Sequence, residues 1–369
     1  MKRLILVGGG HAHVEVLRQF ALQPDDAAEI LLVSPYQHAA YSGMLPGWIA
    51  GHYQASDCQV ALAPLARRAR ARTIWDRVIG INRDAGLLFC ADGMPLHFDW
   101  LSIDIGSRPP TWDTPGADAH ALPIKPIEAF MQRWEQIFQD AVAGRALQCI
   151  VVVGSGAAGL EVATAMQQRL ASVGCKPKFI VIGATGILPG HNASVQRRYA
   201  RLLEQRGIEV LSGKAVAKVG VDYLQLADHR VIASNLTVWA AGAGAPLWPR
   251  ACGLATDAQG FIRVNDSLQA VSARNIFAAG DVATVEPDAR PKSGAYAVRA
   301  GPLLASNIRH ALNGRSLERS PPAAPALALI SAGAHYAVAS RGNLALGGRW
   351  VWQWKDWIDR RWLRKYSSE

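Results

Sequence analysis

The fold is indicated most directly by residues 149–161, which read CIVVVGSGAAGLE. The apolar run predicts a buried strand, and Gly154, Gly156 and Gly159 then form a G-x-G-x-x-G turn that opens a helix. A second apolar run at 179–182, FIVI, completes a β-α-β unit. In such a unit the glycines let the pyrophosphate of a dinucleotide approach the backbone at the positive end of the helix.

The N-terminus carries a second pattern of this kind. Residues 4–7, LILV, predict a strand, Gly8 and Gly10 predict a phosphate-binding turn, and the helix that follows is expected to end near Leu22. A second strand is expected at 30–33. Two such turns, about 145 residues apart, predict an α/β fold with two nested Rossmann-like domains.

The N-terminal pattern departs from the usual motif at two positions. His13 stands where the third glycine is usual, and we expect it to crowd the helix against the strand. Ser34 follows the second strand, where an acidic ribose ligand is common.

Three later segments are predicted to be strands of the same fold, each followed by a glycine. The strands within 99–107 and 236–242 lead into glycine crossings at Gly106 and Gly242. In 275–281, Gly280 and Asp281 follow a buried strand. Asp281 can accept hydrogen bonds from a sugar hydroxyl, although a plain strand-end turn is the alternative. A helix is expected from roughly 295 to 312.

Composition excludes several classes of protein. Half of the 369 residues are apolar, but no run of eighteen forms a clean membrane-spanning helix. The net charge is +10, yet the basic clusters stand beside no nucleic-acid motif, so no nucleic-acid partner is expected. The five cysteines form no C-x-x-C pair, and the chain opens on a strand rather than a signal peptide. These features predict a cytoplasmic protein with reduced cysteines.

Together, the two turns, the crossings and the pair Gly280–Asp281 resemble the pyridine nucleotide-disulfide oxidoreductase superfamily over nearly the whole chain. The type II NADH dehydrogenase and sulfide:quinone reductase branch is nearer, because residues 41–47, YSGMLPG, lack the redox cysteine pair of the disulfide reductases. More narrowly, residues 8–14, 41–47, 101–107, 297–302 and 355–361 resemble the flavoprotein associated with selenide, water dikinase.

The resemblance implies a split FAD-binding domain at 1–120 and 245–320, an inserted NAD(P)H-binding-type domain at 121–244, and a C-terminal hairpin and helix at 321–369. The residues that it implies for FAD are Gly8, Gly10, His11, Ser34, Pro35, Val78, Gly106, Gly280, Asp281 and Ala297. Those implied for the nicotinamide nucleotide are Gly154, Gly156, Gly159 and Gly242. The adenine of FAD is expected near Val78, and the flavin ring between Pro46 and Ala297.

Glu161 and Pro46 are the candidate catalytic residues. Glu161 is expected in the first turn of its helix, where it orients nicotinamide or carries a proton, or simply interacts favourably with the helix dipole. No metal site is expected, because His11 and His13 diverge on a helix. Residues 182–185 lack an acid for a ribose diol, which leaves NADH and NADPH open, and Arg197 and Arg198 either serve a 2′-phosphate or face solvent.

The predicted function is an FAD-dependent oxidoreductase that passes electrons from NAD(P)H to a quinone or a selenium or sulfur acceptor. The alternatives are a chalcogenide-oxidising quinone reductase and a non-catalytic flavoprotein partner of selenophosphate synthesis. Selenide, water dikinase and a second copy of the chain are further expected partners. Tryptophans and basic residues at 350–366 predict peripheral contact with an anionic membrane, at its inner face. The alternative is that the tryptophans cap the FAD domain or form a dimer contact.

Overall fold

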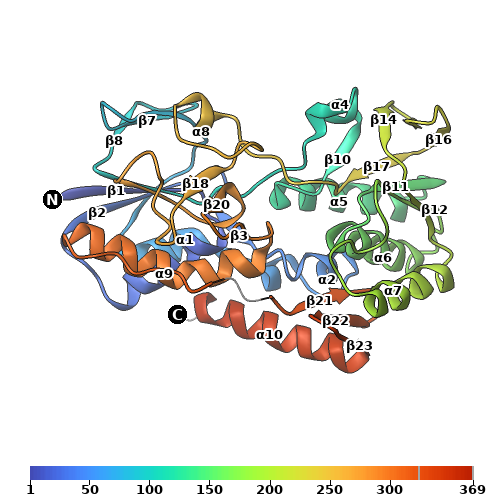
Figure 1. The fold of residues 1–369 in the computed structure, drawn as a ribbon. Coiled ribbons are helices and arrows are strands. Elements are labelled where there is room, and N and C mark those ends of the chain that lie inside the picture. The colour runs from blue at the N-terminus through green and yellow to red at the C-terminus, as the bar shows by residue number, and fades with distance from the viewer. Residues whose placement is uncertain (323–324, 368–369) are drawn as a thin grey trace.

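A computed structural model describes residues 1–322 and 325–367. Its two five-stranded sheets lie toward opposite ends of the molecule in Figure 1. The first sheet has the order β19-β9-β1-β2-β5, and all its strands are parallel. These strands are β1 (Lys2–Val7), β2 (Ala28–Val33), β5 (Arg72–Ile74), β9 (Trp100–Ile103) and β19 (Ile276–Ala278). Because β19 joins this sheet from far along the chain, the second sheet is inserted within the first domain.

The second sheet has the order β10-β17-β11-β12-β13 and is also parallel throughout. Its strands are β10 (Ala121–Pro123), β11 (Cys149–Val153), β12 (Lys178–Gly183), β13 (Glu209–Ser212) and β17 (Leu236–Trp239). The apolar run of β11 suits a strand that is covered on both faces. The prediction of two nested Rossmann-like domains is therefore confirmed.

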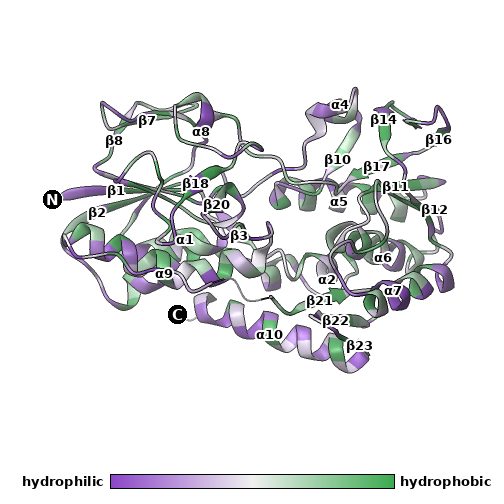
Figure 2. Cartoon of the chain, viewed as in Figure 1, coloured by the Kyte–Doolittle hydropathy of each residue, from purple (hydrophilic) through white to green (hydrophobic). Residues whose placement is uncertain are grey.

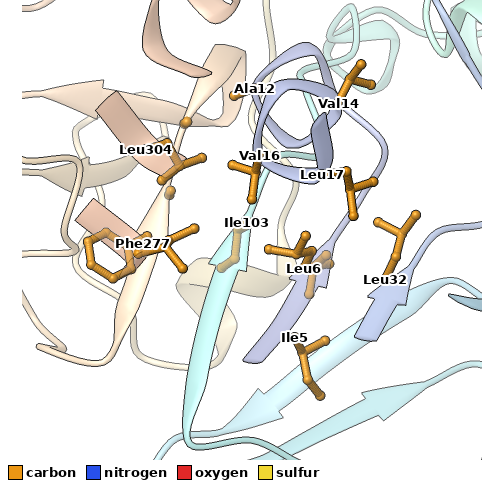
Figure 3. Close-up of a cluster of buried hydrophobic side chains, with 14 of the residues drawn as sticks. Ile5, Leu6, Ala12, Val14, Val16, Leu17, Leu32, Ile103, Phe277 and Leu304 are labelled. Carbon is orange, nitrogen blue, oxygen red and sulfur yellow. The ribbon is translucent and has the colours of Figure 1, made fainter. Parts of the chain in front are cut away.

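Two long helices cover the first sheet. α1 (His11–Leu22) packs against α9 (Gly294–Leu312), and Gly301 permits the close approach, since a Cβ there would lie 2.6 Å from the Cβ of Glu15. Figure 3 shows apolar side chains from β1, α1, β9, β19 and α9 gathered in one buried cluster. This packing fixes the N-terminal end of α1 beside the ends of β1 and β9.

The longer helices of the second domain are α5 (Ile127–Val142), α6 (Ala157–Ala171) and α7 (Ala193–Gln205). The shorter helices are α2 (Leu45–Ile49), α3 (Leu62–Arg68), α4 (Ala117–His120) and α8 (Trp248–Ala251). Two antiparallel sheets are β6 (Val78–Asn82) with β7 (Leu87–Cys90) and β8 (Leu96–His97), and β14 (Val216–Val219) with β15 (Tyr223–Leu226) and β16 (Val231–Ala233). Two strand pairs are β3 (His38–Ala40) with β4 (Gln59–Ala61), and β18 (Ile262–Val264) with β20 (Ala283–Val285).

The C-terminal region is a three-stranded antiparallel sheet followed by a helix. Its elements are β21 (Ala328–Ser331), β22 (Ala337–Arg341), β23 (Leu344–Gly348) and α10 (Arg349–Ser367). Ala337 and Ala339 pack against Val351 of α10, whereas Val338 joins the core of the second domain with Tyr199 of α7. The small sheet therefore lies between α10 and α7. In Figure 2 both helices mix hydrophilic and hydrophobic residues.

The tryptophans of α10 divide between solvent and the protein interior. Helical spacing predicts that Trp350, Trp354, Trp357, Ile358 and Trp362 share one side of the helix. Trp350 and Trp357 are indeed 51% and 52% exposed, but Trp362 is only 7% exposed and stacks on Tyr41 with ring centroids 4.2 Å apart. Trp362 is therefore part of the protein interior. No helix among the described residues is long and apolar enough to cross a membrane.

Candidate active site

The first glycine turn lies between β1 and α1, at the carboxyl edge of the first sheet. Gly8 has a φ of +92°, and a Cβ on it would lie 2.4 Å from the carbonyl oxygen of Asp104, so this position requires glycine. Within residues 1–322 and 325–367, the amides of Gly9 and His11 donate to no other group. These two amides are therefore free to bind a phosphate at the helix N-terminus.

Asp104, which follows β9, occupies the centre of this turn and is not singled out by the sequence pattern. Its carboxylate accepts hydrogen bonds from the amides of Ala12 at 2.8 Å and His13 at 3.1 Å. Burial raises the pKa of Asp104 to about 7, against the lowering effect of these two bonds. A Cβ on Gly10 would lie 2.2 Å from the Asp104 Cγ, and a Cβ on Gly280 2.5 Å from its Oδ1.

Gly10 also has a role that the glycine pattern does not predict, because the space where its side chain would stand holds the Asp104 carboxyl group. The one signal in the sequence is an acidic residue at the end of a strand, two positions before Gly106.

His13 joins α1 to the sheet instead of crowding it. The ring is fully buried, with Nδ1 2.7 Å from the carbonyl oxygen of Gly8 and Nε2 2.8 Å from the hydroxyl of Ser102. Burial lowers the pKa of His13 to about 4, so the ring is neutral at neutral pH. Because a carbonyl only accepts, Nδ1 donates and Nε2 accepts from Ser102. The expectation of crowding was wrong, since the imidazole has two matched partners.

A polar cluster surrounds Asp281 next to this turn. The Nζ of Lys125 lies 2.6 Å from the Oδ2 of Asp281, and the hydroxyl of Ser107 lies 3.3 Å from the same oxygen. The ring of His11 is close to both charges, and its buried Nε2 has no hydrogen-bond partner within the described residues. Burial lowers the pKa of His11 to about 4, so an unpaired, neutral ring nitrogen is available to a ligand.

The remaining residues expected at FAD lie around the same edge of the sheet. Ser34 is buried and its hydroxyl donates to the carbonyl of Tyr36, whereas Pro35 is exposed. Val78 begins β6, and Ala297 lies buried in the first turn of α9. Gly106 has a φ of +68° with open space where a side chain would stand.

In the second glycine turn, the start of α6 packs closely against the backbone that follows β11. Gly154 has a φ of +126°, and a Cβ on Gly159 would lie 2.0 Å from its carbonyl oxygen. A Cβ on Gly156, in contrast, would have no atom within 4 Å, which leaves room for a phosphate. Gly242 crosses beside it with a φ of +72°. At the end of β12, a Cβ on Gly183 would lie 2.1 Å from the hydroxyl of Ser155, so glycine is needed there to leave room for that hydroxyl.

Glu161 is the fifth residue of α6 and lies in its second turn, not in the first as expected. Its Oε1 accepts a hydrogen bond from the amide of Ser331 at 2.7 Å, and the carbonyl of Ser331 accepts one from Tyr199 at 2.5 Å. Burial raises the pKa of Glu161 to about 7, and the charge of Lys355 opposes this shift. A carboxyl group in this setting can gain or lose a proton near neutral pH.

Residues of α10 complete the site from the far end of the chain. The ammonium group of Lys355 donates to the carbonyl of Gly43 and lies 2.5 Å from Asp359, whose carboxylate also accepts a bond from Tyr41 at 3.1 Å. Both charged side chains are at least 90% buried. They fix the segment that leads into α2, where Pro46 is buried, and α2 packs against α6. The spacing of residues in the sequence carries no sign of this contact.

The arrangement suits FAD at the first turn. The amides of Gly9 and His11 would hold its pyrophosphate, Asp281 its ribityl hydroxyls, and the unpaired Nε2 of His11 offers one more polar contact. The second turn, with open space at Gly156, would hold the pyrophosphate of a nicotinamide nucleotide.

Solved structures share this fold. The sulfide:quinone oxidoreductase of Aquifex aeolicus aligns with a TM-score of 0.82 at 20% identity, over 99% of this chain and 91% of that one. NDH2 of Plasmodium falciparum, in complex with NADH, aligns with a TM-score of 0.84 at 14% identity, over 99% and 97%.

Sequence comparison adds a curated relative and a family. An NADH dehydrogenase-like protein of Mycobacterium tuberculosis is 25% identical over 308 residues, which are 78% of this chain and 74% of the relative. Residues 2–301 match the pyridine nucleotide-disulphide oxidoreductase family, and the chain therefore belongs to that family.

Proposed function

We propose that this protein passes electrons from NAD(P)H through FAD to a quinone or to a small selenium or sulfur acceptor. Family membership makes the chain an oxidoreductase, and its relatives support FAD and a nicotinamide nucleotide as cofactors, as the sequence predicted. When bound, FAD accepts a hydride at N5 and stores both electrons. The protein must then position the two substrates and handle protons.

The proposal rests mainly on the position and the pKa of Glu161. NAD(P)H supplies two electrons and one proton, whereas a quinone takes up two electrons and two protons to become a quinol. The second proton must come from water through a group that exchanges protons near pH 7. Glu161, whose pKa is raised to about 7, lies on α6 just beyond the second phosphate turn, and α6 packs against α2. We assign it the role of proton donor.

The relatives support the donor and one acceptor class. The Plasmodium neighbour binds NADH, and the Aquifex neighbour is a sulfide:quinone oxidoreductase. A chalcogenide-oxidising reaction would use a reactive thiol pair, but burial raises the pKa of Cys58 to about 12 and that of Cys90 to about 11. NAD(P)H is therefore the better-supported electron donor.

Anaerobic titration of the FAD-loaded protein tests the proposal. NADH, NADPH, sulfide and selenide are added separately, and flavin bleaching is followed by absorbance. We expect NADH or NADPH to bleach the flavin and a water-soluble quinone to restore its colour. Bleaching by sulfide or selenide alone would reverse the direction of electron flow, and no bleaching by any donor would favour a non-catalytic partner of selenophosphate synthesis.

The exposed side of α10 supports peripheral contact with an anionic membrane. Trp350 and Trp357 are half exposed, and Arg361 and Lys365 are exposed on the same helix. Tryptophan prefers the headgroup level of a bilayer, and each basic residue near an anionic surface adds about 1 kcal/mol. Such contact would bring the protein to a quinone dissolved in the bilayer. The partnership with selenide, water dikinase and the homodimer stay predictions.

A further inference from the structure

The outward face of α7 carries a cationic pocket that no step of the proposed reaction uses. Its volume is about 290 Å³, and its polar lining consists of Ser194, Arg197, Arg198, Arg201, Gln205 and Tyr336. About 10–15 Å³ of such space is enough to admit one water molecule, so the pocket has room for a phosphate group with some of its hydration. The pocket is thus large enough for a small anion.

The spacing on α7 gathers the three guanidinium groups. Arg197 and Arg201 are four residues apart, Arg198 and Arg201 three, so all three share one side of the helix, while Val195, Tyr199 and Leu203 fill the core on the other. Like charges at these spacings destabilise a helix. None of the three forms an ion pair with an acidic side chain in the described parts of the chain.

The C-terminal sheet shapes the pocket from the opposite side. A Cβ on Gly347 of β23 would lie 2.8 Å from the hydroxyl of Tyr336 and 2.8 Å from the Cδ of Arg198. Glycine at this position therefore lets the tyrosine and the arginine converge. A phenol and a guanidinium so placed both donate hydrogen bonds, as an oxyanion requires.

The pocket is separate from the nicotinamide nucleotide site. Its lining comes from residues 194–205 and Tyr336, and includes nothing from the second glycine turn or from the end of β12. The 2′-phosphate role considered for Arg197 and Arg198 stays a prediction. The pocket lies next to Gly347 of β23, the strand that leads into α10. Gly347 is three residues before the exposed Trp350.

We propose that the α7 pocket binds a phosphate-bearing anion, which is either the headgroup of an anionic lipid or a free phosphate. Arginine recognises phosphate through paired, charge-assisted hydrogen bonds, and three guanidinium groups without acidic partners around one pocket suit a dianion or a phosphodiester. The site does not depend on the electron-transfer reaction proposed above.

The test compares two double variants that lose the same charge. Arg198→Gln with Arg201→Gln removes two guanidinium groups from the pocket, and Arg250→Gln with Arg274→Gln removes two exposed arginines elsewhere. Each full-length FAD-loaded protein is titrated with inorganic phosphate by calorimetry. Each is also sedimented at low salt with phosphatidylglycerol vesicles and with phosphatidylcholine vesicles. Oxidation of NADH and of NADPH with a water-soluble quinone is measured in parallel.

We expect the pocket variant to weaken binding of phosphate or of phosphatidylglycerol on the order of tenfold or more, and the control variant less than about threefold. A loss confined to the vesicles identifies the lipid headgroup, and a loss in calorimetry identifies free phosphate. If the two variants bind phosphate and vesicles equally well, the proposal that the α7 pocket binds phosphate is wrong. Absence of oxidation of both NADH and NADPH in the unmodified protein would instead count against the proposed function, and it would leave the phosphate site supported.

Discussion

Two carboxyl groups in the candidate active site, those of Asp104 and Glu161, are brought by burial to a pKa of about 7. Their settings differ. Asp104 accepts two backbone amides at the start of α1, whereas Glu161 accepts one from β21 and lies within the field of Lys355. The first is therefore placed to tune the phosphate turn, and the second to exchange a proton.

Glu161→Gln should slow acceptor reduction roughly ten- to a thousandfold while FAD stays bound. The amide keeps an oxygen for the Ser331 hydrogen bond but cannot donate a proton as an acid does. In the unmodified protein the rate should fall as pH rises above about 7, because the acid form is lost, and the variant should lack this step. Stopped-flow rates from pH 5 to 9 measure this, with the exposed Glu135→Gln as control. An unchanged rate would exclude the proton-donor role.

Asp104→Asn should make stability less dependent on pH. Its folded-state pKa, about 7, lies above the ordinary value of 3.8, so the folded protein holds the proton more tightly than the unfolded chain. The resulting stabilisation is complete below about pH 4 and is lost as pH rises through 7, by up to about 4 kcal/mol. Urea unfolding of the FAD-free protein from pH 4 to 8 should show a shallower decline in the variant. Parallel curves would mean that Asp104 keeps an ordinary pKa.

At the scale of elements, the two glycines of the second turn should respond differently to the same substitution. Gly156→Ala meets no atom within 4 Å, so the protein should fold normally but bind NAD(P)H at least about tenfold more weakly, because the methyl group obstructs the pyrophosphate. Gly159→Ala places a methyl 2.0 Å from the carbonyl of Gly154 and should lower the melting temperature. Thermal unfolding and nucleotide titration separate the two effects. Unchanged affinity in Gly156→Ala would indicate a second site without function.

The elements could be predicted where the sequence pattern is local. The apolar runs at 4–7 and 149–153 and the glycines after them specify both β-α-β units, and α1 ends at Leu22 as expected. His13 could not be interpreted correctly, because its partner Ser102 lies 89 positions along the chain. Asp104 escapes prediction for a similar reason, since its importance depends on the amides of α1 that it caps.

At the scale of the whole molecule, the exposed tryptophans of α10 should bring the protein to anionic bilayers. Trp350→Ser with Trp357→Ser should reduce sedimentation with phosphatidylglycerol vesicles several-fold, because both indoles are half exposed and would otherwise enter the headgroup layer. Trp75→Ser, which alters a 37% exposed tryptophan on the first domain, is the control. Substitution is preferable to truncation at Gly348, which would also remove Lys355 and Trp362 from the interior. Equal sedimentation of all three proteins would contradict the membrane contact.

The position of α10 is the main feature that the sequence could not reveal. Lys355 and Asp359 have the i, i+4 spacing of an exposed ion pair, yet both are buried against the segment that contains Tyr41 and Gly43. Helical spacing shows which residues share a side but not which side faces the protein. The domain boundaries and the individual cofactor contacts likewise stay predictions, since no ligand contact tests them.

The contact between α10 and the Tyr41 segment also bears on how the protein is made. Tyr41 and Asp359 are 318 positions apart, and the ring of Trp362 lies 5.5 Å from that of His11. During translation the phosphate turn leaves the ribosome before its neighbours on α10, which are synthesised hundreds of codons later. Stable capture of FAD should therefore be post-translational, and ribosome-bound chains that stop before codon 349 should retain it poorly.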